Sequence, residues 1–308
     1  MRPLSGVRSY LRARAGESAK YALVLLLAAC TWSSGAGEAP AAAGDVDELI
    51  ASAQPGDVVK LPAGSLGLVT IRERSWSRPL TVDARKSRLR MVLDGVHNLH
   101  ILGGTYADAN DTGRGGYALS VENSSGIRIQ DARFTNATRG LVVGRSEDLV
   151  LQNLEFVDMR AEGINLGLSR RVKIRGVRCS RFNPVPPDHP DCIQAWSRPS
   201  APPSADIEVS DVFVEGSMQG VFFGNHVRNG VDDGGFDRIT IRRDHVTTSF
   251  TNAIALFDCR NCTIVDNVAW SLPNGFNSAL VRVSRCADCT VQNNIQKDRK
   301  GFQERKVK

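Results

Sequence analysis

Two short apolar patterns alternate along most of this 308-residue chain, and their repetition constrains the fold more than any other feature of the sequence. The first pattern is apolar-x-apolar with a further apolar residue five positions later. Its copies include Leu99-x-Ile101 with Tyr106, Ile127-x-Ile129 with Phe134, and Leu149-x-Leu151 with Phe156. The second pattern is a small residue followed by apolar-x-apolar, as in the segments that begin at Ala118, Gly140, Gly163, Cys192 and Gly220.

The alternation predicts two short β-strands in each repeat, because a period of two places apolar side chains on one face of a strand. No helical period separates the strands. Antiparallel hairpins would need a turn signal at every return, and a leucine-rich repeat would need its Leu and Asn positions; the sequence has neither. We therefore expect an all-β chain that winds as a right-handed parallel β-helix, a solenoid of about nine coils.

The ends of such a solenoid are open strand edges that need covers. Residues 45–54 are expected to form a short amphipathic cap helix, started by Asp45 or Asp47. Residues 55–64 then resemble the opening turn of the pectate-lyase-like superfamily. The resemblance covers residues 45–296 and rests on the repeat, so it implies the parallel β-helix fold and leaves the chemistry open. Residues 297–308 are expected to form a basic C-terminal tail.

The first 29 residues have the order of a secretory signal peptide, a basic segment followed by the apolar residues 21–29. They end in Leu27-Ala28-Ala29-Cys30, which resembles the lipobox of bacterial lipoproteins, in which the cysteine is lipidated. Two outcomes stay open: lipidation of Cys30, or cleavage of an ordinary signal further along. Residues 30–44 are predicted to be a flexible tether. Both outcomes predict export, either as a periplasmic or outer-membrane-anchored lipoprotein or by secretion.

The formal net charge of +6 comes from the two termini, and the body between them is slightly acidic. A nucleic-acid-binding face needs clustered basic residues, so we expect no nucleic-acid partner. No segment approaches the roughly 18–20 apolar residues that cross a bilayer, so a membrane contact is expected only through a lipid at Cys30. We expect a monomer.

Two C-x-x-C motifs, Cys259 with Cys262 and Cys286 with Cys289, occupy the same place in successive repeats. One interpretation is a structural zinc held by four thiolates. The other is that the cysteines stack from coil to coil, Cys259 on Cys286 and Cys262 on Cys289, and that stacked pairs close as disulfides in an oxidising compartment. Cys179 and Cys192 are interpreted as packing residues.

The most irregular connection is the proline-rich segment 183–191, which leads into the strand that begins at Cys192. Its end resembles the H-x-D-x-[IVL]-Q segment of secreted β-helix proteins, which lies at the mouth of a strand on the carbohydrate-facing side. The resemblance marks His189, Asp191 and Gln194 as site candidates, with Asp188 and Trp196 beside them.

Alignment of the repeats places further polar residues next to this segment. Asp191 falls in one column with Arg139, Glu162, Gln219 and Asn252. Asp191 and Glu162 would then lie about 5 Å apart on neighbouring strands, and His189 would lie over Arg160. Close carboxylates can share a proton, hold Ca²⁺, or serve as acid and base on a sugar. Equally, they can be turn residues that only bond the backbone of adjacent coils.

These residues support two hypotheses. In the first, the chain acts on an acidic polysaccharide as a lyase or hydrolase, with His189, Asp191, Glu162 and Arg160 catalytic. Substrate-binding residues would then be Gln194, Asn165, Asp188, Trp196 and His226. In the second, the chain is a surface-anchored glycan-binding or structural solenoid without catalysis. Besides the zinc interpretation of the cysteines, Ca²⁺ is a candidate ion, at the paired carboxylates or in the loop 225–236, and no metal ligand is assigned.

Overall fold

The computed structural model describes residues 43–107, 116–199, 202–273, 277–297 and 304–307. These residues belong to one compact unit, Pro40–Lys308. The expected signal peptide, the expected lipidation site Cys30 and most of the expected tether lie outside the described residues. Among the described residues, no helix is long and apolar enough to cross a membrane.

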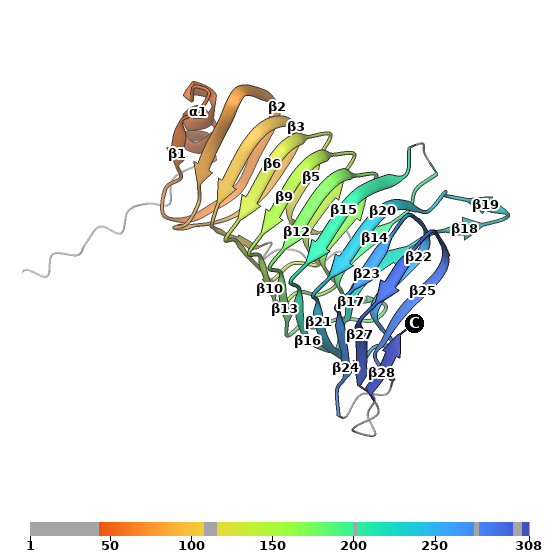
Figure 1. The fold of residues 1–308 in the computed structure, drawn as a ribbon. Coiled ribbons are helices and arrows are strands. Elements are labelled where there is room, and N and C mark those ends of the chain that lie inside the picture. The colour runs from red at the N-terminus through yellow and green to blue at the C-terminus, as the bar shows by residue number, and fades with distance from the viewer. Residues whose placement is uncertain (1–42, 108–115, 200–201, 274–276, 298–303, 308) are drawn as a thin grey trace, which may run out of the picture. The chain divides into compact units, whose positions relative to one another are not determined.

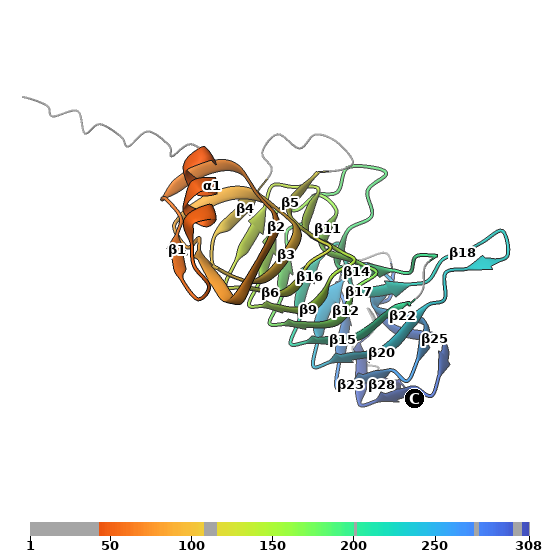
Figure 2. The same cartoon turned by 90° about the horizontal axis from the view of Figure 1, so that it is seen from above.

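The described residues form an all-β right-handed parallel β-helix, and one short helix stands at its N-terminal end (Figure 1). This helix, α1 (Ala43–Ser52), begins two residues before the predicted cap helix. Val46 and Ile50 are buried in the core, so α1 covers the first coil, as predicted (Figure 2). The pairing between successive coils is parallel throughout the solenoid body.

Each coil contributes strands to three faces, which we call the first, second and third faces. The first face contains β5 (Tyr117–Glu122), β8 (Arg139–Gly144), β11 (Glu162–Gly167), β14 (Asp191–Trp196) and β17 (Gln219–Gly224). The second face contains β1 (Val58–Lys60), β6 (Ser125–Gln130), β9 (Glu147–Gln152), β12 (Arg170–Arg175), β15 (Ser204–Ser210), β20 (Phe236–Arg242), β23 (Thr263–Val265) and β26 (Thr290–Gln292).

The third face consists of shorter strands. These are β4 (Thr105–Ala107), β7 (Arg133–Thr135), β10 (Glu155–Val157), β13 (Arg178–Ser180), β16 (Phe213–Gly216), β21 (His245–Thr248), β24 (Val268–Ser271) and β27 (Asn294–Lys297). Longer strands run across more than one face, namely β2 (Gly64–Asp83), β3 (Ser87–Leu102), β22 (Asn252–Arg260) and β25 (Leu280–Ala287). Two antiparallel additions complete the described strands: the hairpin of β18 (Val227–Arg228) and β19 (Val231–Asp232), and β28 (Glu304–Val307), which pairs with β27.

The third strand of each coil was not predicted. The apolar residue five positions beyond the first pattern, such as Tyr106, Phe134 or Phe156, is the single inward residue of this strand. These three rings are fully buried and stack on one another, with centroids 5.1 and 4.6 Å apart. A strand of three residues with one inward position has no period for the sequence to display.

Polar side chains form a buried ladder at one corner of the later coils. The Oδ1 atoms of Asp244, Asn267 and Asn294 accept hydrogen bonds from the backbone N–H groups of Val212, Asp244 and Asn267, at 2.9, 2.9 and 3.1 Å. The amides of Asn267 and Asn294 also donate to the carbonyl groups of Ile241 and Ile264. Asp244 has no amide to donate, and its Oδ2 is buried without a hydrogen bond in the described structure.

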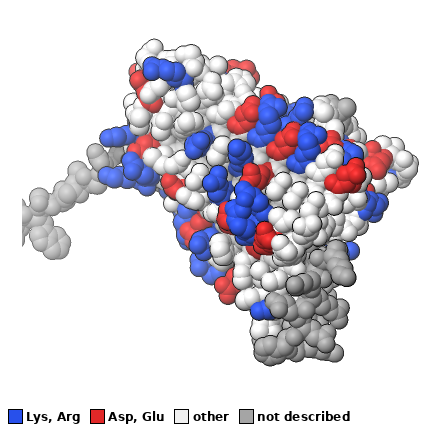
Figure 3. Space-filling model, in the orientation of Figure 1, with Lys and Arg blue, Asp and Glu red and all other residues white. Residues whose placement is uncertain are grey.

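Charged side chains on the outside pair from coil to coil. Arg171 forms a bidentate ion pair with Asp148, and Arg238 does so with Asp206. The hydrogen bonds from Arg171 and Arg238 hold the pKa values of the two aspartates below their usual range. Acidic and basic atoms are therefore interspersed on the outer surface, as Figure 3 shows for one side of the molecule.

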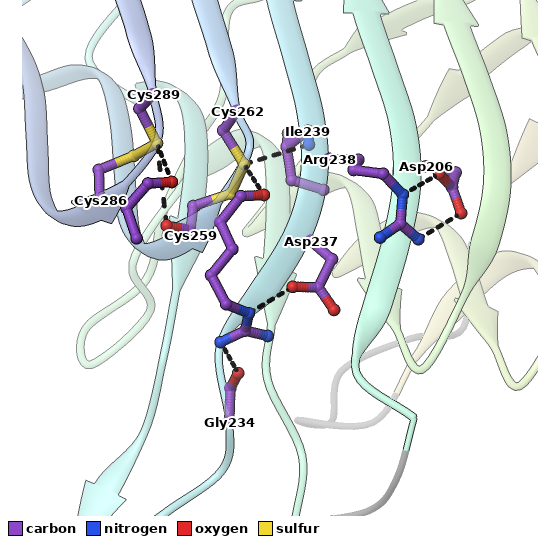
Figure 4. The surroundings of a disulfide bond; sticks show 11 residues. Asp206, Gly234, Asp237, Arg238, Ile239, Cys259, Cys262, Cys286 and Cys289 are labelled. Atoms are coloured by element: carbon purple, nitrogen blue, oxygen red, sulfur yellow. Dashed lines mark hydrogen bonds and ion pairs between the residues drawn. A yellow bond between two sulfur atoms is a disulfide. The ribbon is translucent and has the colours of Figure 1, made fainter.

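The disulfide pattern differs from the prediction. Cys259 and Cys286 are register partners in adjacent coils, as expected, but the bonds form within each motif, Cys259–Cys262 and Cys286–Cys289 (Figure 4). The two cysteines of a motif flank one short turn, so they reach each other without crossing between coils. The cysteine sulfurs are oxidised, which leaves no thiolates for the zinc interpretation.

Cys179 and Cys192, interpreted from the sequence as packing residues, form a third disulfide. Cys179 is the inward residue of the third-face strand β13, and Cys192 is the small inward residue at the start of the first-face strand β14. Their Cα atoms are 5.7 Å apart because these two strands meet at a corner of the core. This bond closes the irregular segment that carries the candidate site.

Candidate functional site

The predicted site lies where residues 181–190 lead from β13 into the first-face strand β14. The coil alignment is confirmed by the strand register. Asp191 pairs in register with Glu162 in the preceding coil and with Gln219 in the following coil. Asn165 and Gln194 are likewise register partners, and both point outward from the first face.

His189 and Asp191 form the centre of the site. The Asp191 side chain is 0% exposed, whereas the His189 side chain above it is 60% exposed. His189 Nδ1 lies 3.4 Å from Asp191 Oδ2. The same oxygen accepts a 2.8 Å hydrogen bond from Gln194 Nε2, and Gln194 Oε1 accepts one from Asn165 Nδ2, also at 2.8 Å. An exposed imidazole is thus held over a buried carboxylate, and a chain of amides orients that carboxylate.

The protonation of this pair is shifted by its surroundings. Burial raises the pKa of the Asp191 carboxyl, and the contact with His189 only partly offsets this effect. The hydrogen bond to Asp191 raises the pKa of the His189 imidazole, against an opposing effect of burial. The pair therefore retains a proton at higher pH than isolated side chains would.

Gln219 and Phe250 complete the surroundings of His189, and neither residue was assigned a role from the sequence. Gln219 Nε2 lies 2.9 Å from His189 Nδ1, and the Phe250 ring meets the imidazole edge-on with centroids 5.7 Å apart. Asp191 Oδ1 and Gln219 Oε1 are buried acceptors without a hydrogen bond in the described structure. A proton on Asp191, or the opposite orientation of the Gln219 amide, would supply a donor. The repeat alignment could have identified Gln219, because this residue belongs to the same column as Asp191. Phe250 lies in a turn outside the repeat, so the alignment contained no signal for it.

Glu162 is 8% exposed and lies in the coil before Asp191. Its Oε2 is 2.9 Å from Arg139 Nε. Burial raises the pKa of Glu162, Arg139 lowers it, and the nearby Asp191 raises it further. Glu162 is therefore next to the site, as predicted. Its charge is neutralised by Arg139, which belongs to the same aligned column but was assigned no role from the sequence.

Arg160 reaches the same segment through Asp188. Its Nε lies 2.5 Å from Asp188 Oδ2 and its Nη2 3.2 Å from Oδ1, which makes a bidentate pair. The sequence placed His189 over Arg160, but the charged partner is the preceding residue. A planar guanidinium that already holds one carboxylate bidentately has the geometry that a sugar carboxylate would need.

Trp196 and His226, predicted as substrate-binding residues, lie together at the other end of β14. Their rings stack at 4.4 Å with an interplanar angle of 4°. Phe222 meets Trp196 edge-on at 5.2 Å and Phe257 at 5.8 Å, so four rings form a cluster on the outside of the first face. His226 therefore borders the same face as Gln194.

The loop 225–236, considered from the sequence as a calcium loop, is tied by its own contacts. Asp232 Oδ1 accepts from Asn225 Nδ2 at 2.8 Å and from the Gly234 N–H at 2.7 Å. Asp233 Oδ2 lies 3.5 Å from His226 Nδ1. In the part of the chain that the structure describes, no group of three or more His, Cys, Asp or Glu side chains is placed to hold a metal ion.

Comparisons with known proteins agree with this architecture. The family model described as "Right handed beta helix region" matches residues 117–302. An alginate lyase from Paenibacillus sp. str. FPU-7 superposes with a TM-score of 0.51 at 13% identity, over 82% of this chain and 97% of that one. PfbA, a surface adhesin of Streptococcus pneumoniae, superposes with a TM-score of 0.53 at 9% identity, over 82% and 75%. At these identities the likeness concerns the fold alone, and no curated protein matches the chain.

Proposed function

We propose that this chain, which belongs to the right-handed beta helix family, cleaves an acidic polysaccharide by β-elimination, with His189 as the base. The observation that carries the proposal is the exposed imidazole of His189 over the fully buried carboxylate of Asp191. A buried acid below a histidine fixes the orientation of the ring and stabilises its protonated form, as a general base requires.

The proposed reaction is a lyase step on a uronate. Neutral His189 removes the C5 proton, the electron pair forms the C4–C5 double bond, and the glycosidic oxygen at C4 leaves with a proton. The proton that His189 has gained is available to that oxygen. Arg160 would hold the uronate carboxylate in place of Asp188, whose carboxylate now occupies the guanidinium fork.

Hydrolysis by the two aligned carboxylates fits the geometry less well. A glycosidase needs both carboxyl groups in contact with the sugar or with its attacking water. Asp191 is fully buried, and Glu162 is nearly buried and paired with Arg139. Asp191 is therefore assigned as a positioning residue for His189, and Glu162 as a buried charge that tunes the pair.

Export is part of the proposal, because the polymer would be met outside the cytoplasm. The signal-like residues 1–29 and Cys30 support it, and so do the three disulfides, since such bonds persist in oxidising compartments. Lipidation of Cys30 would leave residues 31–42 as a tether between the membrane and α1.

A second candidate function is glycan binding without catalysis, as in a surface-displayed solenoid. The observation that favours it is the cluster of Trp196, His226, Phe222 and Phe257 on the first face, because aromatic rings offer flat apolar surfaces to sugars. The two structural neighbours, named as an alginate lyase and a surface adhesin, share only the fold with this chain and so do not decide between the candidates.

The two candidates are separated by product analysis on a panel of polyuronates, with the neutral polymers of matching linkage as controls. A lyase produces unsaturated ends that absorb in the ultraviolet, whereas a hydrolase produces reducing ends without that absorbance. We expect ultraviolet-absorbing products from at least one polyuronate. Binding without either product would replace the lyase proposal by the glycan-binding one.

A further inference from the structure

The outside of the third face carries a row of aromatic side chains that the proposed reaction does not use. Phe213, His245 and Trp270 lie on the consecutive strands β16, β21 and β24, which follow one another along one edge of the solenoid (Figure 1). Register pairs Arg178 with Phe213, Phe213 with His245, and Trp270 with Lys297. We call these five residues the aromatic strip.

The members of the aromatic strip touch in sequence. The Arg178 guanidinium lies 4.8 Å from the Phe213 ring centroid, and the Phe213 and His245 rings are 6.3 Å apart and nearly parallel. His245 meets Trp270 edge-on at 4.5 Å, and the Lys297 ammonium lies 4.5 Å from the Trp270 ring. One continuous surface thus crosses five coils and carries a cation at each end.

Packing of the core does not account for these rings. The inward positions of the same strands are filled by Cys179, Val214, Val246 and Ala269, which are buried. The outward Phe213 is 44% exposed, where the preceding coils place the charged residues Arg133, Glu155 and Arg178. A single exposed apolar residue is common on protein surfaces, whereas an exposed phenylalanine that neighbouring rings extend into a patch marks an interaction surface.

A groove of about 410 Å³ runs beside the aromatic strip. Its lining combines the rings of Phe213 and His245 with hydroxyl and charged groups, from Ser180, Thr247, Arg178, Glu155 and Glu215. Apolar flat surfaces next to a few hydrogen-bonding groups are the composition of a carbohydrate site. Among the side chains that the structure describes, Arg178 forms no ion pair with a carboxylate, so its charge is available to an anion.

We propose that the aromatic strip is a second glycan-binding surface, which takes a stretch of acidic polysaccharide along the solenoid axis. Sugar rings would pack on Phe213, His245 and Trp270, and the carboxylates of the polymer would approach Arg178 and Lys297. The strip belongs to the third face and the His189–Asp191 pair to the first face, so binding here would keep a long polymer on the protein without occupying the proposed reaction site. The identity of the polymer rests on the proposed function; the existence of the strip does not.

The test is the affinity of the full chain for polygalacturonate and alginate of high molecular weight, measured by affinity electrophoresis. The double variant Phe213→Ala with Trp270→Ala is compared with the wild type and with Val231→Ala, which removes an exposed apolar side chain from the β18–β19 hairpin. We expect the double variant to bind about tenfold more weakly and Val231→Ala to bind as the wild type does. Circular dichroism and thermal melting show whether the double variant is folded.

A second measurement keeps the two proposals apart. The double variant should retain its turnover of short uronate oligomers, which cannot reach both faces, while His189→Ala should lose turnover and retain polymer binding. Unchanged polymer affinity in a folded double variant would overturn the proposal that the aromatic strip binds glycan. The strip would then serve another partner, such as a protein. Loss of polymer affinity in a chain that shows no lyase activity would support the strip and overturn the proposed reaction.

Discussion

Asp244 should make the β-helix less stable as the pH rises, and replacing it with asparagine should remove that loss. The carboxyl group is buried at a corner of the core, in the ladder whose next two members are Asn267 and Asn294. Burial raises the pKa of Asp244 from 3.8 to about 8. The folded state therefore keeps this proton through a pH range in which the unfolded chain releases it.

The sign and size of the effect follow from that difference. Below about pH 4 both states are protonated and Asp244 costs nothing; from there to about pH 8 stability falls by about 1.4 kcal/mol per pH unit. Asp244→Asn cannot lose a proton. It should gain about 1.5 kcal/mol over the wild type at about pH 5 and about 5 kcal/mol at about pH 8. Its amide can also donate to a backbone carbonyl, as the Asn267 and Asn294 amides do.

Urea unfolding of wild type and variant at several pH values measures these differences directly. The reciprocal change Asn267→Asp, at the next position of the same ladder, is the matched control and should lose stability increasingly as the pH rises. If the stabilities of wild type and Asp244→Asn ran parallel from about pH 4 to about pH 8, the buried-proton argument would be refuted.

Three further predictions follow from the disulfide, the signal and the site. Replacing Cys179 and Cys192 together by serine should lower the free energy of unfolding by about 3 kcal/mol, from the chain entropy of the 13-residue separation; urea unfolding without reductant measures it, and an unchanged midpoint contradicts it. Export in a bacterial host should leave a lipid on Cys30, which mass spectrometry detects and which Cys30→Ser should lose; an unmodified Cys30 in the exported wild type contradicts lipidation. The acid limb of the lyase pH profile should lie above the usual imidazole range, because Asp191 raises the pKa of His189 and the base acts when neutral. Asp191→Asn should move that limb to lower pH. A limb that does not move would mean that His189 is not the titrating group.

The fold could be predicted from the sequence because a β-helix repeats its inward positions. Each coil must place apolar residues over those of the coil before, so Ile127, Leu149 and Val172 appear in the sequence at the spacing of the coils. The same stacking gave the alignment of Glu162, Asp191 and Gln219, which the register confirms. The third-face strands were not predicted because most of them are three residues long with one inward residue.

The contacts that escaped prediction depend on how different faces meet. Cys179 and Cys192 lie on different strands of the repeat, and only the corner between β13 and β14 brings them together. Arg160 pairs with Asp188 because of the path of residues 181–190, which no repeat specifies. In the sequence, Asp244 is one of many polar turn residues, and only the structure shows that its carboxyl group is buried. Repetition therefore reveals stacking along the axis, while contacts across the coil need the structure.

The proposed reaction requires His189 to act as the base. The most direct measurement is the initial rate of ultraviolet-absorbing product from a polyuronate, for the wild type, His189→Ala and the control His100→Ala, whose imidazole lies on the second face. The proposal predicts that His189→Ala slows this rate about a hundredfold or more, while His100→Ala leaves it unchanged and both variants melt as the wild type does. A folded His189→Ala variant that forms product at the wild-type rate would contradict the central claim.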